Sequence, residues 1–245
     1  MINPRLASVI ERRLLVNYRV DPEAAAALLP AGLVPQLVNG WAVAGICLLR
    51  LGNTRPVWAP GGTGLRSENA AHRIAVTWEG PDGAGTGVYI PRRDSGSRLN
   101  VLAGGRVFPG THGSAVFDVA ETPHDLRIGY ETRDGTTRVQ VAARVADALL
   151  GSELFGTVDE ASEFFRQGPS GYSPDRSGTR LDGMRLHTDA WRVVPAVLDS
   201  VTSTFFEDPE RFPPGTAHLD SALLMRDVPV HWEPLAALRL AAGAS

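Results

Sequence analysis

Short β-rich segments, each ending at a turn, follow one another through most of the 245-residue chain. Asp134-Gly135 is a two-residue turn of the kind that joins the strands of a hairpin. Parallel strands need long crossover connections, usually helices, and few helical segments separate these strands. The sequence therefore predicts a mainly β fold with few helices, either a sandwich or a barrel of antiparallel strands. The strands are expected at residues 14–20, 41–49, 73–78, 87–91, 114–119, 126–132, 138–145, 184–194, 196–206 and 222–232.

Two short helices are expected between the strands. Asp21-Pro22 is typical of a helix start, because an N-cap residue precedes proline at the first helical position. A second helix is predicted at residues 158–167, since Thr157 and Glu160 have the spacing of a capping box. The stretch 168–183 is rich in glycine, serine and proline, and we expect it to be a mobile lid over a cavity.

Length and composition favour one domain covering residues 1–245. Hydrophobic residues make up 43% and charged residues 21%, an ordinary globular mixture unlike that of disordered chains. The net charge is -3 and the arginines are scattered among acids, so nucleic acid is not an expected partner. No apolar stretch approaches ~18 residues and no signal pattern precedes the fold, which predicts a cytoplasmic protein without membrane contact. Whether copies of the chain form a homo-oligomer is left open.

The chain contains no lysine, because all 24 residues in the Lys+Arg total are arginines. No side-chain amine can therefore form an imine, whereas guanidinium groups suit carboxylates and phosphates. Cys47 is the one cysteine, and its apolar surroundings predict a buried, inert thiol. No cofactor is expected: the glycines at 61–64 lack the lysine of a phosphate loop, and those at 83–87 lead into a strand where a dinucleotide fingerprint opens a helix.

Two His-x-Asp pairs are the candidates for a metal site. On strands, His187 with Asp189 and His218 with Asp220 would each place a nitrogen and an oxygen ligand on one face. Such pairs are more often ordinary solvated surface, and we predict no metal site. A Gly-x-Ser-x-Gly motif is also absent, which removes the commonest signature of a serine hydrolase.

The densest group of polar residues carries a resemblance to a known family. It consists of three motifs, Glu68-Asn69, Gly87-Val88-Tyr89 with an acid after it, and Gly104-Gly105-Arg106 leading through Phe108-Pro109 to a strand. This pattern resembles the uncharacterised YqjF-like branch of the acetoacetate decarboxylase-like superfamily over about residues 13–232. The resemblance implies an antiparallel β-barrel or cone around a largely closed apolar cavity, with polar side chains converging at one end.

The chain departs from the decarboxylase at the catalytic lysine. In that enzyme a lysine in a Gly-Arg-x-x-x-Gly-Phe-Pro-Lys-Lys stretch forms an imine with the substrate ketone. This sequence keeps Gly105, Arg106, Phe108 and Pro109 but has Gly110, Thr111 and His112 where the lysines would fall. The imine mechanism cannot operate here.

Four residues are candidates for catalysis. The resemblance implies two of them, Glu68, which resembles the family's barrel-facing glutamate, and Arg106, which matches its Gly-Arg pair. His112 and His72 are added because imidazole titrates near neutrality, and His112 occupies the segment where related enzymes keep their nucleophile. A structural reading competes at each position, since Glu68 and Arg106 can form a buried ion pair between strands and a lone histidine is more often structural.

Three further residues are candidates for substrate binding, namely Tyr89, Arg92 and Thr111. Tyr89 alternates with apolar neighbours, so a core ring with a satisfied hydroxyl is the competing interpretation. Arg92 and Arg93 are consecutive on a strand and face opposite ways, so at most one of them enters a cavity.

These observations favour a cofactor-independent enzyme that uses acid–base chemistry on a small molecule bearing a carbonyl or carboxylate. Arg106 would hold a carboxylate or enolate, while Glu68 and His112 move protons. Dehydration, cyclisation, isomerisation and decarboxylation without an imine all fit, in a bacterial specialised metabolism that the arginine-only composition hints at. The alternative is a binding protein that holds an apolar ligand in the same cavity. Several convergent titratable groups with perturbed pKa values would favour the enzyme.

Overall fold

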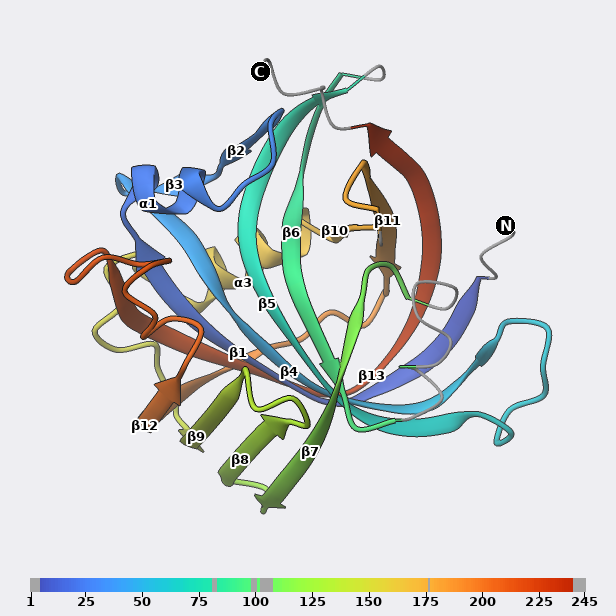
Figure 1. The fold of residues 1–245 in the computed structure, drawn as a ribbon. Helices are drawn as coiled ribbons and strands as arrows, with labels where there is room; N and C mark the ends of the chain where they lie inside the picture. Colours follow the sequence, from blue (N-terminus) through green and yellow to red (C-terminus); the bar gives the residue numbers. More distant parts are fainter. Residues whose placement is uncertain (1–4, 81–82, 98–100, 102–107, 176, 240–245) are drawn as a thin grey trace.

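The computed structural model describes residues 5–80, 83–97, 101, 108–175 and 177–239. In this part of the chain one strongly curved sheet of thirteen strands dominates, and it is accompanied by two helices (Figure 1). The strands are β1 Leu6–Val20, β2 Leu33–Pro35, β3 Leu37–Val38, β4 Trp41–Pro56, β5 Leu65–Gly80, β6 Gly83–Ser95, β7 His112–Glu121, β8 Asp125–Thr132, β9 Arg138–Val145, β10 Ser170–Pro174, β11 Arg180–His187, β12 Val194–Ser203 and β13 Ala217–Arg239. The helices are α1 Pro22–Ala27 and α3 Val158–Gln167.

Strand pairing closes this sheet into two rings that share a wall. The wall consists of β13, β1, β4, β5 and β6, which are antiparallel neighbours in that order. β10 and β11 connect β6 back to β13 and complete a seven-strand ring. β7, β8, β9 and β12 connect the same two strands and complete a nine-strand ring, on the opposite side of the wall in Figure 1.

The mainly β fold class and the hairpin around Asp134-Gly135 are confirmed, because β8 and β9 pair antiparallel. The prediction of a two-residue turn is wrong, since Thr132 bonds to Thr137 across a four-residue loop and, of Asp134 and Gly135, Gly135 alone has a positive φ. The sheet is mixed, however, since β6 runs parallel to both β7 and β10. A single length of β13 serves both rings: residues 222–224 pair with β12 and residues 231–239 with β11. The expected purely antiparallel barrel is therefore corrected at β6, whose parallel partners are β7, the next strand in the chain, and the distant β10.

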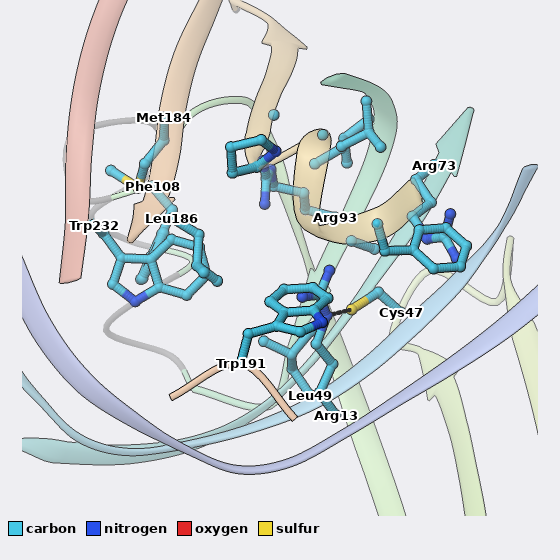
Figure 2. Close-up of a pocket in the computed structure, with 17 residues that line it drawn as sticks. Arg13, Cys47, Leu49, Arg73, Arg93, Phe108, Met184, Leu186, Trp191 and Trp232 are labelled. Carbon is cyan, nitrogen blue, oxygen red and sulfur yellow. Dashed lines mark hydrogen bonds between the residues drawn. The ribbon is translucent and has the colours of Figure 1, made fainter. Parts of the chain in front are cut away.

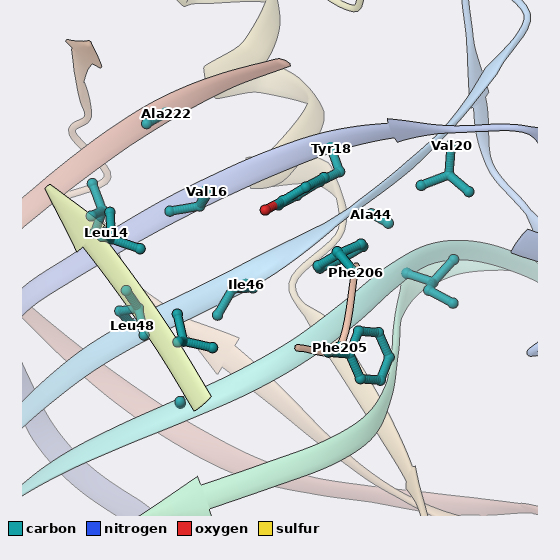
Figure 3. Packing of buried hydrophobic residues seen from close by; sticks show 14 of the residues in the cluster. Leu14, Val16, Tyr18, Val20, Ala44, Ile46, Leu48, Phe205, Phe206 and Ala222 are labelled. Carbon is teal, nitrogen blue, oxygen red and sulfur yellow. The ribbon is translucent and has the colours of Figure 1, made fainter. Parts of the chain in front are cut away.

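Alternation along the strands of the wall divides their side chains between two faces. Leu14, Val16 and Tyr18 of β1 project into the main core, where Ile46 of β4 and Phe206 meet them (Figure 3). The other face carries a separate buried cluster, which α3 covers. Its buried members are Leu15, Val43, Cys47, Ala75, Leu154, Phe155, Ala161, Phe165 and Leu223.

Both predicted helix starts are confirmed. Asp21 accepts hydrogen bonds from the backbone N–H groups of Glu23 and Ala24 and begins α1. Thr157 Oγ1 accepts from the Glu160 N–H at 3.1 Å and begins α3. Neither helix of the described residues is long and apolar enough to cross a membrane.

The prediction of an irregular lid at residues 168–183 is wrong, because most of this stretch is sheet, although Gly168, Pro169 and Gly171 do line a cavity. Ser170–Pro174 forms β10, which pairs with β11 on one side and with β6 on the other. Gly87 allows β10 to lie this close to β6, since a Cβ atom at position 87 would be 2.3 Å from the Ser170 carbonyl oxygen. Glycine and serine weaken local strand propensity, but backbone hydrogen bonds to two neighbouring strands override it.

Candidate functional site

The seven-strand ring encloses a cavity of about 110 Å³ with mainly apolar walls, which we call the arginine chamber (Figure 2). All seven strands of the ring contribute to it. Its charged residues are Arg13 on β1, Arg73 on β5 and Arg93 on β6. In Figure 2 the labelled apolar side chains Phe108, Met184, Leu186 and Trp232 gather at one end, and Arg13, Arg73 and Cys47 lie at the other.

Arg73 is the most deeply buried of the three arginines, with 3% of its surface exposed. One terminal nitrogen donates to the Asn17 side-chain oxygen, and the guanidinium lies 4.6 Å from the centre of the Phe165 ring. Its Nε and its other terminal nitrogen have no hydrogen-bond partner among the described residues. Burial lowers the pKa of Arg73 to about 10, so it remains a cation at neutral pH.

Arg13 and Arg93 donate hydrogen bonds to side chains that are not carboxylates. Arg13 Nε donates to Cys47 Sγ at 3.2 Å, and the Arg13 guanidinium lies 5.9 Å from the Trp191 ring centre. Arg93 Nε donates to Ser173 Oγ at 3.1 Å, and burial lowers the pKa of Arg93 to about 10. Within the described chain, no carboxylate lies at ion-pair distance from any of the three arginines. Among the described residues, the chamber therefore has three cations and no counterion.

A smaller cavity of about 60 Å³ adjoins the arginine chamber, and we call it the histidine chamber. The two cavities share Leu49, Ala71, Arg93, Phe108 and Trp232. The histidine chamber adds Asp94 of β6 and His112, the first residue of β7.

Strand register places the main polar residues of both chambers in one row. Cys47 pairs with Ala71, Ala71 with Arg93, and Arg93 with His112, across β4, β5, β6 and β7. Residues paired in this way on adjacent strands lie beside one another on the sheet. The row therefore runs from the thiol of the arginine chamber, past a shared guanidinium, to the imidazole of the histidine chamber.

His112 and Asp94 are the titratable groups of the histidine chamber. Burial and then repulsion from Arg93 lower the pKa of His112 to about 4, so the ring is neutral at pH 7 and its buried Nε2 has no partner in the described chain. Asp94 Oδ2 accepts from Arg92 Nε at 3.0 Å and from the Tyr130 hydroxyl at 3.4 Å, while Oδ1 is buried without a partner. Burial raises the pKa of Asp94. His112 and Asp94 can both transfer protons, and each has a buried atom without a hydrogen-bond partner in the described chain, in a cavity that Arg93 also lines.

Glu68 lies outside both chambers, in a cluster of ion pairs. Its carboxylate accepts from Arg12 at 2.6 Å and from Arg50 Nε at 2.5 Å, and Arg50 also binds Glu121. This cluster joins β1, β4, β5 and β7, and Glu68 lines an open groove instead of either chamber. The structure therefore does not bring Glu68 and His112 to one cavity, and Arg106 lies outside the described residues.

The other predicted residues are divided between the main core and an open cavity. His72 projects into the main core and stacks on Phe205 with ring centroids 4.2 Å apart; burial lowers the pKa of His72 to about 3. Tyr89 is buried in the same core, and burial raises the pKa of Tyr89. Arg92 and Thr111 line an open cavity of about 490 Å³ to which His112 also contributes.

Sequence reasoning missed Arg13, Arg73, Arg93 and Asp94, and it chose Arg92 for substrate binding instead of its neighbour Arg93. Arg93 lines both chambers, whereas Arg92 lines the open cavity and binds Asp94. The signal that could have found Arg73 is its place between Ala71 and Ala75, the two apolar residues on the same face of the strand.

The two His-x-Asp pairs have other partners in the structure. His187 Nε2 lies 3.1 Å from the Glu233 carboxylate, and both residues are on the surface. Asp220 accepts from Ser152 Oγ at 2.6 Å, while the His218 ring donates to the Gly215 carbonyl at 2.9 Å. Among the described residues no cluster of three or more histidine, cysteine, aspartate or glutamate side chains could hold a metal ion.

Comparison with models of protein families shows the family of this chain. The model of DUF2071, described as "Uncharacterized conserved protein (COG2071)", matches residues 9–226. The chain belongs to this family. A search of curated proteins finds no match to this DUF2071 protein.

Solved structures show the same fold at low sequence identity. An acetoacetate decarboxylase-like enzyme from Sphingomonas wittichii RW1 has a TM-score of 0.63 and 13% identity, covering 99% of this chain and 95% of that one. The enduracididine biosynthesis enzyme MppR, complexed with the condensation product of pyruvate and imidazole 4-carboxaldehyde, has a TM-score of 0.60 and 13% identity over 98% and 91%. Acetoacetate decarboxylase from Legionella pneumophila has 0.51 and 12% over 94% and 87%. The DUF2071 protein therefore has an acetoacetate decarboxylase-like fold, as the sequence motifs implied.

Proposed function

We propose that this DUF2071 protein is a cofactor-independent enzyme that acts by acid–base chemistry on a small carbonyl compound bearing a carboxylate. The observation that carries the proposal is the set of three arginines in one mainly apolar chamber next to His112, none of which has a carboxylate partner in the described part of the chain. Buried like charges repel one another strongly because the local dielectric constant is low, and a bound anion relieves that cost. The chamber is thus matched to an anionic ligand.

The carboxylate of the substrate would bind Arg13 and Arg73, because the free N–H groups of a guanidinium fork suit two-point contacts with carboxylate oxygens. The apolar part would pack on Phe108 and Trp232, and the carbonyl would lie at Arg93, which faces both chambers. The MppR structure with a pyruvate-derived product supports a small carbonyl acid as the class of ligand for this fold.

His112 would transfer the proton. In its neutral form it can accept a proton from the carbon next to the carbonyl, while Arg93 stabilises the enolate that forms. A substrate anion near Arg93 offsets the repulsion that lowers the pKa of His112, which brings the imidazole toward the range of an effective base. Asp94 Oδ1 is the second group available to receive or return a proton. An enolate of this kind fits dehydration, cyclisation, isomerisation and non-imine decarboxylation alike.

The mainly apolar walls also fit the alternative function, a binding protein for a small amphipathic ligand. The enzymatic function is favoured because two adjoining cavities are lined by titratable groups with shifted pKa values. These groups are His112, Asp94, Arg73 and Arg93. Convergence of perturbed titratable groups is typical of catalytic sites, whereas a binding site needs only an anchor.

The test uses 2-oxo acids such as pyruvate, with the corresponding amides as neutral controls. The acids should raise the melting temperature, and their α-hydrogens should exchange with deuterium in heavy water, followed by NMR. His112→Gln should keep the thermal shift while exchange falls by about 10²-fold or more. Arg13→Gln, which removes one of the guanidinium groups that bind the carboxylate, should lose the thermal shift. Arg144→Gln is the matched control, since Arg144 is exposed and pairs with Asp199. Absence of any thermal shift, or exchange that survives in His112→Gln, would refute the proposal.

A further inference from the structure

Cys47 is a nucleophile that the acid–base mechanism does not use. It is the one cysteine of the sequence, and 4% of its surface is exposed. Its side chain lines the arginine chamber, and Sγ accepts a hydrogen bond from Arg13 Nε, drawn as the dashed line in Figure 2. Of the described side chains that line this chamber, no other carries a thiol or hydroxyl group.

A second feature of the chamber points to a ligand beside this thiol. Arg73 is 3% exposed, and two of its nitrogens have no hydrogen-bond partner in the described chain. Cys47 lines the same chamber. An unpaired buried cation next to a thiol favours an anion whose carbon atoms contact the sulfur.

We propose that Cys47 is a covalent modification site for short carboxylates that carry an electrophilic carbon. The inference rests on the anion binding in the proposed function but not on turnover. Arg73 and Arg13 hold the carboxylate, and the electrophilic carbon lies against Cys47 Sγ. With iodoacetate as the probe, the S–C bond forms, the C–I bond breaks, iodide leaves and the thiol proton passes to solvent. The attached carboxylate then occupies the chamber and excludes other anions from it.

Binding in the chamber makes the reaction selective. Holding a reagent against the sulfur raises its effective concentration there, provided that the reagent has a group the chamber binds. Iodoacetamide has nearly the same size as iodoacetate but no negative charge, so it gains nothing from the two guanidinium groups. The volume of about 110 Å³ restricts the site to small molecules.

The experiment compares the rates at which iodoacetate and iodoacetamide label the native full-length protein, measured by intact mass and peptide mapping. Each rate is divided by the rate for glutathione under the same conditions. Iodoacetate should be favoured by about tenfold or more. Arg13→Gln should remove this preference, whereas Arg144→Gln, which makes the same charge change at an exposed site, should retain it. Cys47→Ser should abolish labelling.

Two further outcomes separate this inference from the proposed function. If Arg13→Gln does not fold, wild-type protein supplies the test, because pyruvate should slow iodoacetate labelling, whereas the neutral amide of pyruvate at the same concentration should not. A normalised preference near one, or labelling only after denaturation, overturns the modification site. Should pyruvate still raise the melting temperature in that case, the proposed function survives. If iodoacetate labels preferentially but no α-hydrogen exchange is detected, the modification site is supported and the proposed enzymatic function is refuted.

Discussion

The arginines of the shared wall fall into two groups that differ in their partners. Arg12 and Arg13 are consecutive on β1 and therefore face opposite sides of the sheet. Arg12 is 1% exposed and pairs with Glu68, while Arg13 lines the arginine chamber and has no carboxylate partner in the described chain. Paired arginines of this kind hold strands together, and unpaired ones are available to a ligand.

Glu68→Gln should lower the free energy of unfolding by roughly 3 kcal/mol, because it leaves the buried guanidinium of Arg12 without its main anion. Urea denaturation measures this change. Activity per folded molecule should stay near that of the wild type, since Glu68 lines neither chamber. Glu131→Gln, which removes an exposed partner of Arg138, is the control and should have little effect. Unchanged stability together with lost turnover would instead make Glu68 catalytic.

His72→Leu should stabilise the protein by roughly 1 to 2 kcal/mol at pH 7. Both ring nitrogens of His72 are buried without hydrogen-bond partners in the described chain, and an apolar side chain of similar size removes that desolvation cost. Thermal and urea unfolding check the gain, with His187→Leu on the surface as the control. A loss of stability would show that a polar contact of His72 contributes to the fold.

Acid should destabilise the protein below about pH 6.5. Burial is the main reason that the pKa values of His72 and His112 fall to about 3 and about 4, below the unfolded value of about 6.5. The unfolded chain therefore binds more protons, and stability is complete above pH 6.5 and falls as the pH decreases toward 4. The raised pKa of Asp94 acts in the opposite direction. His72→Leu should remove roughly half of the histidine contribution to the slope; an unchanged slope in urea unfolding from pH 7 to 4.5 would contradict this.

Among the secondary-structure elements, β6 connects the two rings. Its middle residues, Val88 and Tyr89, pair with β10, and its last three residues, Arg93–Ser95, pair with β7. It pairs with β5 along nearly its whole length. One strand thus carries Arg93 and Asp94 and also holds the hairpin that completes the arginine chamber.

Gly87→Ala should loosen that hairpin. The added methyl group would lie 2.3 Å from the Ser170 backbone oxygen, so β10 must move away from β6. We expect a loss of roughly 1 to 3 kcal/mol in stability, the usual cost of overpacking, and a smaller thermal shift with pyruvate. Gly129→Ala on β8 is the matched control, since its nearest contact is the flexible Gln140 side chain at 3.4 Å. Equal behaviour of the two variants would contradict the role of this close approach.

Across the full barrel, the two rings share five strands and should unfold together. Loss of either ring exposes one buried face of the shared wall, which removes part of the burial that stabilises the other ring. Hydrogen exchange along a urea series, followed by mass spectrometry, should give one midpoint for peptides from β8–β9 and from β10–β11. A lower midpoint for β10–β11 would show that the seven-strand ring opens independently.

Features that depend on neighbouring residues could be predicted from the sequence. The β class, the β8–β9 hairpin and the starts of α1 and α3 follow from alternation, turn chemistry and capping, which act over a few residues. The absence of lysine likewise excludes a side-chain imine, because amino-acid composition does not depend on the fold. The family motif also directed attention to the polar segment around His112.

Which polar residues meet could not be predicted, because it depends on contacts between distant strands. Cys47, Arg93 and His112 form a row because β4, β5, β6 and β7 pair in one particular register, and a shift of one residue would turn each side chain to the other face. The partner of Glu68 is Arg12, 56 residues away, and the segment at 168–183 became sheet through β6, which lies some 80 residues earlier in the chain. Register between distant strands results from the packing of the complete barrel, so local patterns in the chain do not contain it.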